Sequence, residues 1–92
     1  MIRHIVMWKF KEGEDPTDFL NGLKALQGQI PQIRYMELHR SCVENADYDA
    51  LLISDFDSLE DLNIYKKDPR HVAVSALCKK IRTDRSAIDF EV

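Results

Sequence analysis

One stretch near the start of the chain decides the fold: Ile2-Arg3-His4-Ile5-Val6-Met7-Trp8-Lys9-Phe10-Lys11. Because side chains alternate between the two faces of a β-strand, this stretch separates into two sets. One set is apolar apart from a single histidine and contains Ile2, His4, Val6, Trp8 and Phe10. The other is apolar only in its middle and contains Arg3, Ile5, Met7, Lys9 and Lys11. A strand with one wet face is polar throughout that face, so the pattern predicts protein contacts on both faces.

Segments further along the chain complete the set of expected elements. Residues 16–30 carry a narrow apolar stripe at helical spacing, which predicts a helix that Pro31 ends. Strands are expected at 32–40, 48–57 and 86–92. The strand at 48–57 again has apolar residues on both faces, as the first strand does.

A second helical region is expected after Ser58, a residue type that caps the free amides at helix starts. Pro69 interrupts this region, because proline lacks an amide hydrogen and disfavours helical geometry in the residue before it. The segment that follows is expected to bury Val74, Leu77, Cys78 and Ile81. Four basic residues are interpreted as a solvated helix end rather than as a phosphate site: Lys79, Lys80, Arg82 and Arg85.

The order strand, helix, strand, strand, helix, strand is that of the α+β ferredoxin-like (βαββαβ) fold, a four-stranded antiparallel sheet with helices on one face. Ninety-two residues suffice for one core, so we expect one domain over 1–92. Helices on one face leave the other face open, although three strands carry apolar residues on both faces. We therefore expect a homodimer through the open face, in contact at Ile5, Met7, Met36, Leu38, Leu51 and Ile53.

Composition argues against several classes of function. The chain is 45% hydrophobic and 32% charged with a net charge of −3, which gives no reason to expect a nucleic-acid or anionic-membrane partner. No run approaches the ~18 apolar residues of a membrane span. No signal peptide is evident, so we expect a soluble cytoplasmic protein in which Cys42 and Cys78 are reduced. Motifs for metal or phosphate binding are missing, and no cofactor is expected.

Several segments resemble the stress-responsive A/B barrel (Dabb) domain, a family of the dimeric α/β-barrel superfamily. Besides the first strand, the matching motifs are Ile30-Pro31-Gln32-Ile33, Asp47-Tyr48-Asp49-Ala50-Leu51, Tyr65-Lys66-Lys67-Asp68-Pro69-Arg70-His71 and Asp84-Arg85-Ser86-Ala87-Ile88-Asp89-Phe90. Together they extend over essentially the whole chain. The resemblance implies a dimeric α/β barrel, in which two sheets pack face to face.

The resemblance also implies candidate site residues. One family member, the plant olivetolic acid cyclase, closes a linear polyketide by an aldol-type condensation. Its pattern is a histidine in the first strand, a tyrosine ending a helix and a histidine just past a proline, and His4, Tyr65 and His71 match it. Asp89 matches an acidic position that orients a histidine. The chain departs from the family's frequent His-Pro-x-His motif, because Asp68 stands where the first histidine would be.

An aldol-type step needs a base near neutrality, which suits His71 steered by Asp89, and a donor to the developing enolate oxygen, which suits Tyr65 or His4. The ligand, a small hydrophobic or carbonyl compound, is expected between helices and sheet. Its pocket is expected to be lined by Val6, Trp8, Phe19, Leu20 and Leu23. Two alternatives stay open: a non-catalytic, stress-associated binding module, and a haem- or quinol-type monooxygenase of the same superfamily.

Overall fold

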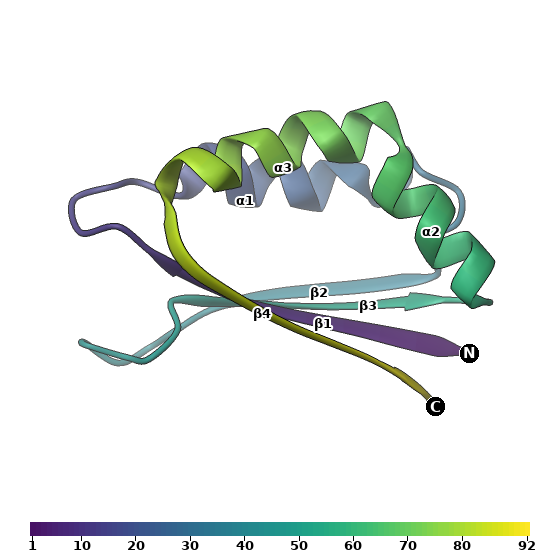
Figure 1. Ribbon diagram of the computed structural model, residues 1–92, viewed down its shortest axis with the longest axis horizontal. Helices are drawn as coiled ribbons and strands as arrows, with labels where there is room; N and C mark the ends of the chain where they lie inside the picture. Colours follow the sequence, from purple (N-terminus) through teal and green to yellow (C-terminus); the bar gives the residue numbers. More distant parts are fainter.

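The computed structural model describes all residues of the chain, 1–92. Its elements in order are β1 (Ile2–Phe10), α1 (Thr17–Leu26), β2 (Tyr35–Arg40), β3 (Ala50–Phe56), α2 (Leu59–Lys67), α3 (Pro69–Ile81) and β4 (Arg82–Glu91). The strands form one antiparallel sheet in the order β2-β3-β1-β4, and all the helices lie on one of its faces (Figure 1). This is the ferredoxin-like arrangement, so the predicted fold is confirmed.

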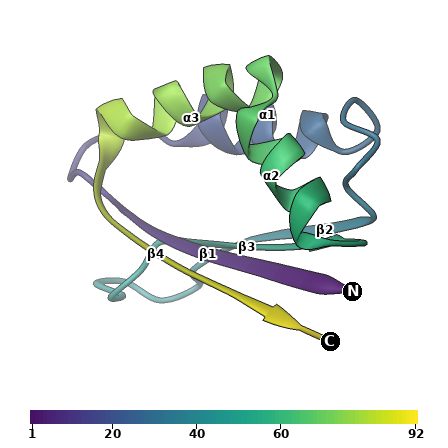
Figure 2. The same cartoon turned by 45° about the vertical axis from the view of Figure 1, so that its right-hand side comes forward.

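The helices form a layer in which α1 and α3 lie next to each other above the sheet, with α2 at one end (Figure 2). Because β1 and β4 are neighbours, the two ends of the chain meet, and the Val92 amide donates a hydrogen bond to the Met1 carbonyl at 2.9 Å. None of the helices combines the length and the hydropathy needed to cross a bilayer.

Helix α1 is shorter than the sequence pattern predicts. At its start the Asp15 carboxylate accepts a hydrogen bond from the Thr17 amide at 3.0 Å. It ends at Leu26, four residues before the predicted end, and the chain turns at Gly28 with φ of 91°. Glycine adopts this left-handed conformation without the clash that a Cβ atom causes, so it favours a turn here over a further helical turn.

Side chains cap the starts of both α2 and α3, and the cap of α2 is the predicted one. The Ser58 hydroxyl accepts a hydrogen bond from the Asp61 amide at 3.1 Å at the start of α2. The Asp68 carboxylate does the same for the Arg70 amide, at 2.9 Å, just before Pro69 opens α3. The aspartate that departs from the family motif is therefore the N-cap of α3.

Strand β4 begins at Arg82, four residues earlier than predicted, because it pairs with β1 along nearly its whole length. Arg82 and Arg85 therefore belong to a strand, and their interpretation as part of a solvated helix end is wrong. Strands β2 and β3 are shorter than predicted, since the residues before each of them form turns and bends.

The pairing register corrects the prediction for β2. Met36 lies opposite Ser54 and Leu38 opposite Leu52, and these β3 residues share the helix-covered face with His4. Directly opposed residues in an antiparallel sheet project from the same face. The prediction that Met36 and Leu38 lie on the open face is therefore wrong. The open-face positions of β2 belong instead to Tyr35, Glu37 and His39.

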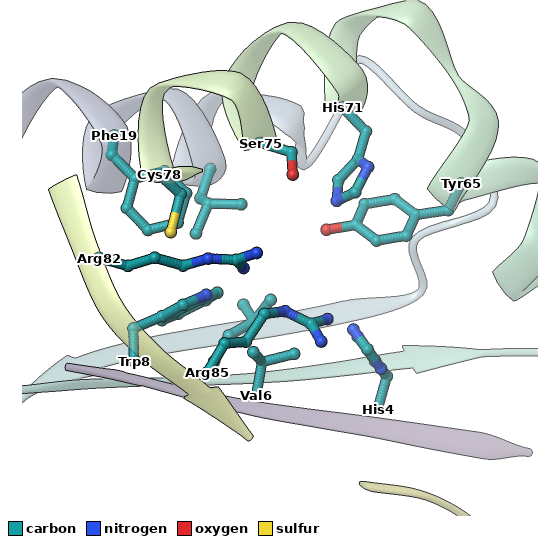
Figure 3. Close-up of a pocket in the computed structure, with 12 residues that line it drawn as sticks. His4, Val6, Trp8, Phe19, Tyr65, His71, Ser75, Cys78, Arg82 and Arg85 are labelled. Atoms are coloured by element: carbon teal, nitrogen blue, oxygen red, sulfur yellow. The ribbon is translucent and has the colours of Figure 1, made fainter. Parts of the chain in front are cut away.

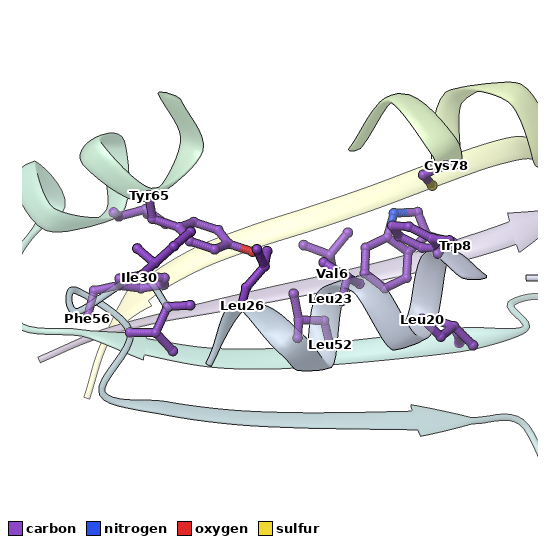
Figure 4. Close-up of a cluster of buried hydrophobic side chains, with 14 of the residues drawn as sticks. Val6, Trp8, Leu20, Leu23, Leu26, Ile30, Leu52, Phe56, Tyr65 and Cys78 are labelled. Atoms are coloured by element: carbon purple, nitrogen blue, oxygen red, sulfur yellow. The ribbon is translucent and has the colours of Figure 1, made fainter. Parts of the chain in front are cut away.

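The core lies between the sheet and the helices, and its central members are drawn in Figure 4. Leu23 of α1 is 2% exposed, as its stripe predicts, but Leu77 of α3 is 40% exposed, so its predicted burial is wrong. The side of α3 that faces the sheet instead carries His71, Ser75 and Cys78, at spacings of four and three residues. Leu77 lies about 100° around the helix from Cys78 and so points away from the core.

Candidate active site

A cavity of about 40 Å³ lies between the helices and the sheet (Figure 3). Such a volume holds about three water molecules. Every helix and three of the four strands contribute to its lining, which consists of His4, Val6, Trp8, Phe19, Leu23, Leu52, Tyr65, His71, Ser75, Cys78, Arg82 and Arg85.

The structure brings three of the predicted catalytic residues together in this lining. The ring centroids of Tyr65 and His71 are 4.4 Å apart, and those of His4 and Tyr65 are 6.5 Å apart. Most of the residues predicted to bind a ligand line the same cavity: Val6, Trp8, Phe19 and Leu23. Leu20 does not, because it lies on another side of α1, in a groove shared with Leu38.

His4 is the histidine that a carboxylate orients. Asp89 lies directly opposite it in the β1–β4 ladder, and the Asp89 carboxylate is hydrogen-bonded to the His4 Nδ1 atom. The Lys66 ammonium lies 3.7 Å from the other carboxylate oxygen. The expectation that Asp89 steers His71 is therefore wrong, because His71 is on α3, across the cavity. When Nδ1–H donates to the carboxylate, neutral His4 keeps a free lone pair on Nε2.

His71 is held in a similar way by a backbone group. Its Nδ1 atom lies 3.1 Å from the Lys66 carbonyl oxygen, which only accepts hydrogen bonds, so Nδ1 carries the proton and Nε2 is free. His71 lies in the first turn of α3, and Arg70 stabilises this turn. The Arg70 guanidinium donates hydrogen bonds to the Asp68 carboxylate at 2.8 Å and to the Gln29 carbonyl at 2.6 Å. The Arg70 guanidinium lowers the pKa of Asp68 to about 2.

Both imidazoles are kept neutral by their surroundings. Burial lowers the pKa of His4, against the opposing effect of the Asp89 hydrogen bond. Burial likewise lowers the pKa of His71, against the hydrogen bond with the Lys66 carbonyl. The nearby Arg85 cation lowers both values further. Each ring is therefore ready to accept a proton near neutral pH.

Tyr65 is fully buried, and its hydroxyl has no hydrogen-bond partner in the protein. Figure 3 shows this hydroxyl pointing into the cavity between the two histidines. Burial raises the pKa of Tyr65 well above its ordinary value of 10, so the phenol keeps its proton. A buried hydroxyl without a partner costs about 1–3 kcal/mol, which an acceptor on a ligand would recover.

Five lining residues were not predicted as part of the site: Ser75, Cys78, Arg82, Arg85 and Leu52. The first two follow His71 at helical spacing, so the sequence did contain a signal for them. Burial raises the pKa of the Cys78 thiol, which keeps it protonated. The two arginines gave no such signal, because their positions depend on where β4 starts and how it pairs with β1.

Comparisons with known proteins agree with this architecture. Residues 2–92 match the family model described as the stress responsive A/B barrel domain. The Arabidopsis thaliana protein DABB1, a stress-response A/B barrel domain-containing protein, is 31% identical over 98% of this chain and 46% of its own length. The chain thus spans about half the length of this curated relative.

Solved structures show the same fold. A dimeric protein of unknown function from Bacteroides fragilis, with a ferredoxin-like fold, is 26% identical, with a TM-score of 0.90 over 99% of this chain and 95% of that one. The hydroxynitrile lyase from Passiflora edulis is 15% identical, with a TM-score of 0.86 over 99% and 92%, and shows the fold alone. The chain belongs to the stress-responsive A/B barrel (Dabb) family.

Proposed function

We propose that this Dabb domain binds a small carbonyl compound in its cavity and catalyses acid–base chemistry at the carbon beside the carbonyl, as a cyclase or lyase does. One observation carries the proposal. A buried tyrosine hydroxyl without a partner and two neutral imidazoles face the same cavity. Such a space offers one donor and two proton acceptors to a single ligand, which is the set that enolate formation requires.

In the proposed mechanism His4 is the base. Its Nε2 lone pair takes a proton from the carbon next to the carbonyl, and the Asp89 carboxylate stabilises the imidazolium that forms. Electrons of the broken C–H bond move to the carbonyl oxygen, which the Tyr65 hydroxyl meets with a hydrogen bond. The enolate carbon can then attack a second carbonyl, whose π electrons move to its oxygen, and the His4 imidazolium returns its proton to that alkoxide. The Nδ1 atom of His71 is bonded to a neutral backbone carbonyl, which stabilises an imidazolium less than a carboxylate does. We therefore assign His71 the easier task of accepting a hydroxyl proton of the substrate.

Related proteins give limited support. The Passiflora edulis protein carries the name of a lyase, but at 15% identity it shows the fold and not the reaction. A haem-type monooxygenase is less well supported, because about 40 Å³ is far below the roughly 300–1,000 Å³ of pockets that enclose large ligands. A non-catalytic binding module would use the same cavity, and it is the outcome that a lack of turnover would favour.

We also propose that the protein assembles as a homodimer through the open sheet face. The register places Ile5, Met7, Leu51 and Ile53 side by side there, at the centre of the sheet. Ile88 and Phe90 of β4 extend this apolar surface and remain exposed in the single chain. A contiguous apolar patch on the surface of a soluble protein marks an interaction site, and a stable interface would bury about 1,200–2,000 Å². The Bacteroides fragilis relative is described as dimeric.

Hydrogen–deuterium exchange tests the proposed chemistry without knowledge of the natural substrate. A panel of small ketones and β-keto esters is incubated with the protein in deuterated water, and loss of the α-hydrogen signal is followed by NMR. His4→Gln should slow the exchange by about 10²-fold or more, and Tyr65→Phe by about 10²-fold. His39→Gln is the matched control, because His39 is exposed and lies on the open face. Exchange no faster than in buffer for every compound would leave the binding module as the better function.

A further inference from the structure

We propose that the ligand of this site is a short keto acid, and that Arg82 and Arg85 hold its carboxylate. The inference rests on the proposed function and names its substrate class. The lining of the cavity includes two guanidinium groups and no carboxylate. This is unexpected in a chain with 16 acidic and 13 basic residues, in which acidic partners outnumber cations.

Three of the other four arginines in the chain are ion-paired. Arg3, Arg34 and Arg70 each bind an aspartate at 2.8 Å, whereas neither Arg82 nor Arg85 is ion-paired. Two unpaired guanidinium groups side by side repel each other, and an anion between them removes that repulsion. A carboxylate suits the position, because its two oxygens match the fork of the guanidinium donors.

An irregularity in the sheet directs both arginines to the same space. Residues three apart on a regular strand project from opposite faces. Here Lys9 lies opposite Asp84 but Phe10 lies opposite Arg82, so β4 has one extra residue at this point. The shift places Arg82 on the same face as Arg85, which lies opposite Trp8. Figure 3 shows both side chains reaching into the cavity over Trp8 and Val6.

The rest of the lining sets the remaining features of the ligand. Val6, Trp8, Phe19 and Leu52 give the cavity an apolar floor and wall, which suit a carbon chain. The Tyr65 hydroxyl and the two histidines provide the polar end at which a carbonyl oxygen is recognised. With about 40 Å³ available, the chain between carbonyl and carboxylate must be short. Arg85 is exposed and so stands where the cavity meets solvent, able to swing aside for a longer ligand.

A binding experiment with two matched ligands tests this inference. Acetoacetate and its methyl ester have the same ketone, but only acetoacetate carries a negatively charged carboxylate. We expect acetoacetate to bind the wild-type protein about tenfold or more tightly than the ester, as observed for hydrogen bonds to charged groups. Arg85→Gln and Arg82→Gln should each bring the two affinities close together. Arg40→Gln is the matched control, since Arg40 is unpaired but lies outside the cavity, and it should retain the full preference.

Affinity is measured by calorimetry and by NMR shifts, so the result does not depend on turnover. Equal affinities for the two ligands, or binding of neither at millimolar concentration, would overturn the keto-acid assignment. Tighter binding of inorganic phosphate than of acetoacetate would overturn it as well. Preferential binding of acetoacetate without α-hydrogen exchange would support the anion site and refute the proposed catalysis. If the α-hydrogens of the ester exchange at the same rate as those of acetoacetate, the proposed catalysis is supported and the anion site is refuted.

Discussion

The two faces of the sheet bury the alternate residues of β1 to different extents. On the helix-covered face, His4, Val6, Trp8 and Phe10 are all at most 7% exposed. On the open face, Arg3, Ile5, Met7 and Lys9 are only partly buried. The first set forms the floor of the cavity and part of the core. The second set has apolar residues in the middle and cations at both ends, and its burial is incomplete in a single chain.

Charge is distributed differently on the two faces. On the covered face the one polar side chain of β1, His4, is satisfied from the neighbouring strand by Asp89. On the open face the cations at the ends of β1 pair with acids at the margin, Arg3 with Asp55 at 2.8 Å and Lys9 with Asp49 at 3.2 Å. An apolar centre with a polar margin is the usual composition of a protein interface. The two faces of β1 therefore fit the proposed site on one side and the proposed dimer interface on the other.

The largest expected effect is on assembly. Ile53→Asp places a carboxylate at the centre of the open face, where a second sheet would bury it without a partner. Burial of an unpaired charge costs several kcal/mol, so the dimer should weaken by about 10²-fold or more. Sedimentation velocity at micromolar concentration should change from dimer to monomer. Ile64→Asp on the exposed side of α2 should leave the assembly unchanged. A monomeric wild type, or a dimeric Ile53→Asp variant, would contradict the proposed interface.

The next effect separates the core from the outer surface of the helices. Leu23→Ala removes a fully buried side chain under α1 and should cost about 2–5 kcal/mol of unfolding free energy. Leu77→Ala makes the same chemical change at a partly exposed position and should cost less than about 1 kcal/mol. Urea denaturation of both variants gives the two values directly. Equal losses would mean that α3 is rotated from the orientation described above.

A smaller effect distinguishes the site from the packing around it. Tyr65→Phe removes a hydroxyl that has no partner in the protein and keeps the buried ring. We therefore expect the unfolding free energy to stay the same or to rise by about 1 kcal/mol, in contrast to the slower α-hydrogen exchange expected of the same variant. Thermal and urea denaturation test this in the absence of ligand. A loss of stability above about 1 kcal/mol would show that the hydroxyl is bonded within the folded protein.

The smallest effect concerns pH. The pKa of His4 and of His71 is lowered from 6.5, so the unfolded chain binds more protons than the folded one just below that value. Stability should be fully present above pH 6.5 and should decrease as the pH falls below it. Carboxylates, with ordinary pKa values near 4, contribute little between about pH 5 and 6.5. In His71→Asn the decrease over this interval should be smaller than in the wild type. Identical slopes would show that His71 is not held neutral by burial.

The sequence predicts those features of the fold and site that depend on local residue patterns, but not those that depend on how the strands pair. Alternation along β1 needs no knowledge of a partner strand, so the burial of Val6 and Trp8 was predicted correctly. The faces of β2 depend on its register with β3, which is why Met36 was placed on the wrong one. The partner of Asp89 is set by register too. The position of Arg82 also needs the irregularity in β4, which no local pattern of residue types reveals.

The most direct test of the two-face account compares two adjacent residues of β1. Ile5→Asp alters the open face and His4→Gln alters the cavity, and both variants are measured for sedimentation and for α-hydrogen exchange. The account predicts that Ile5→Asp becomes monomeric but still catalyses exchange, because the whole cavity lies within one chain. His4→Gln should stay dimeric and lose exchange. If either folded variant loses both properties, or if each loses the property assigned to the other, the two faces do not have separate functions.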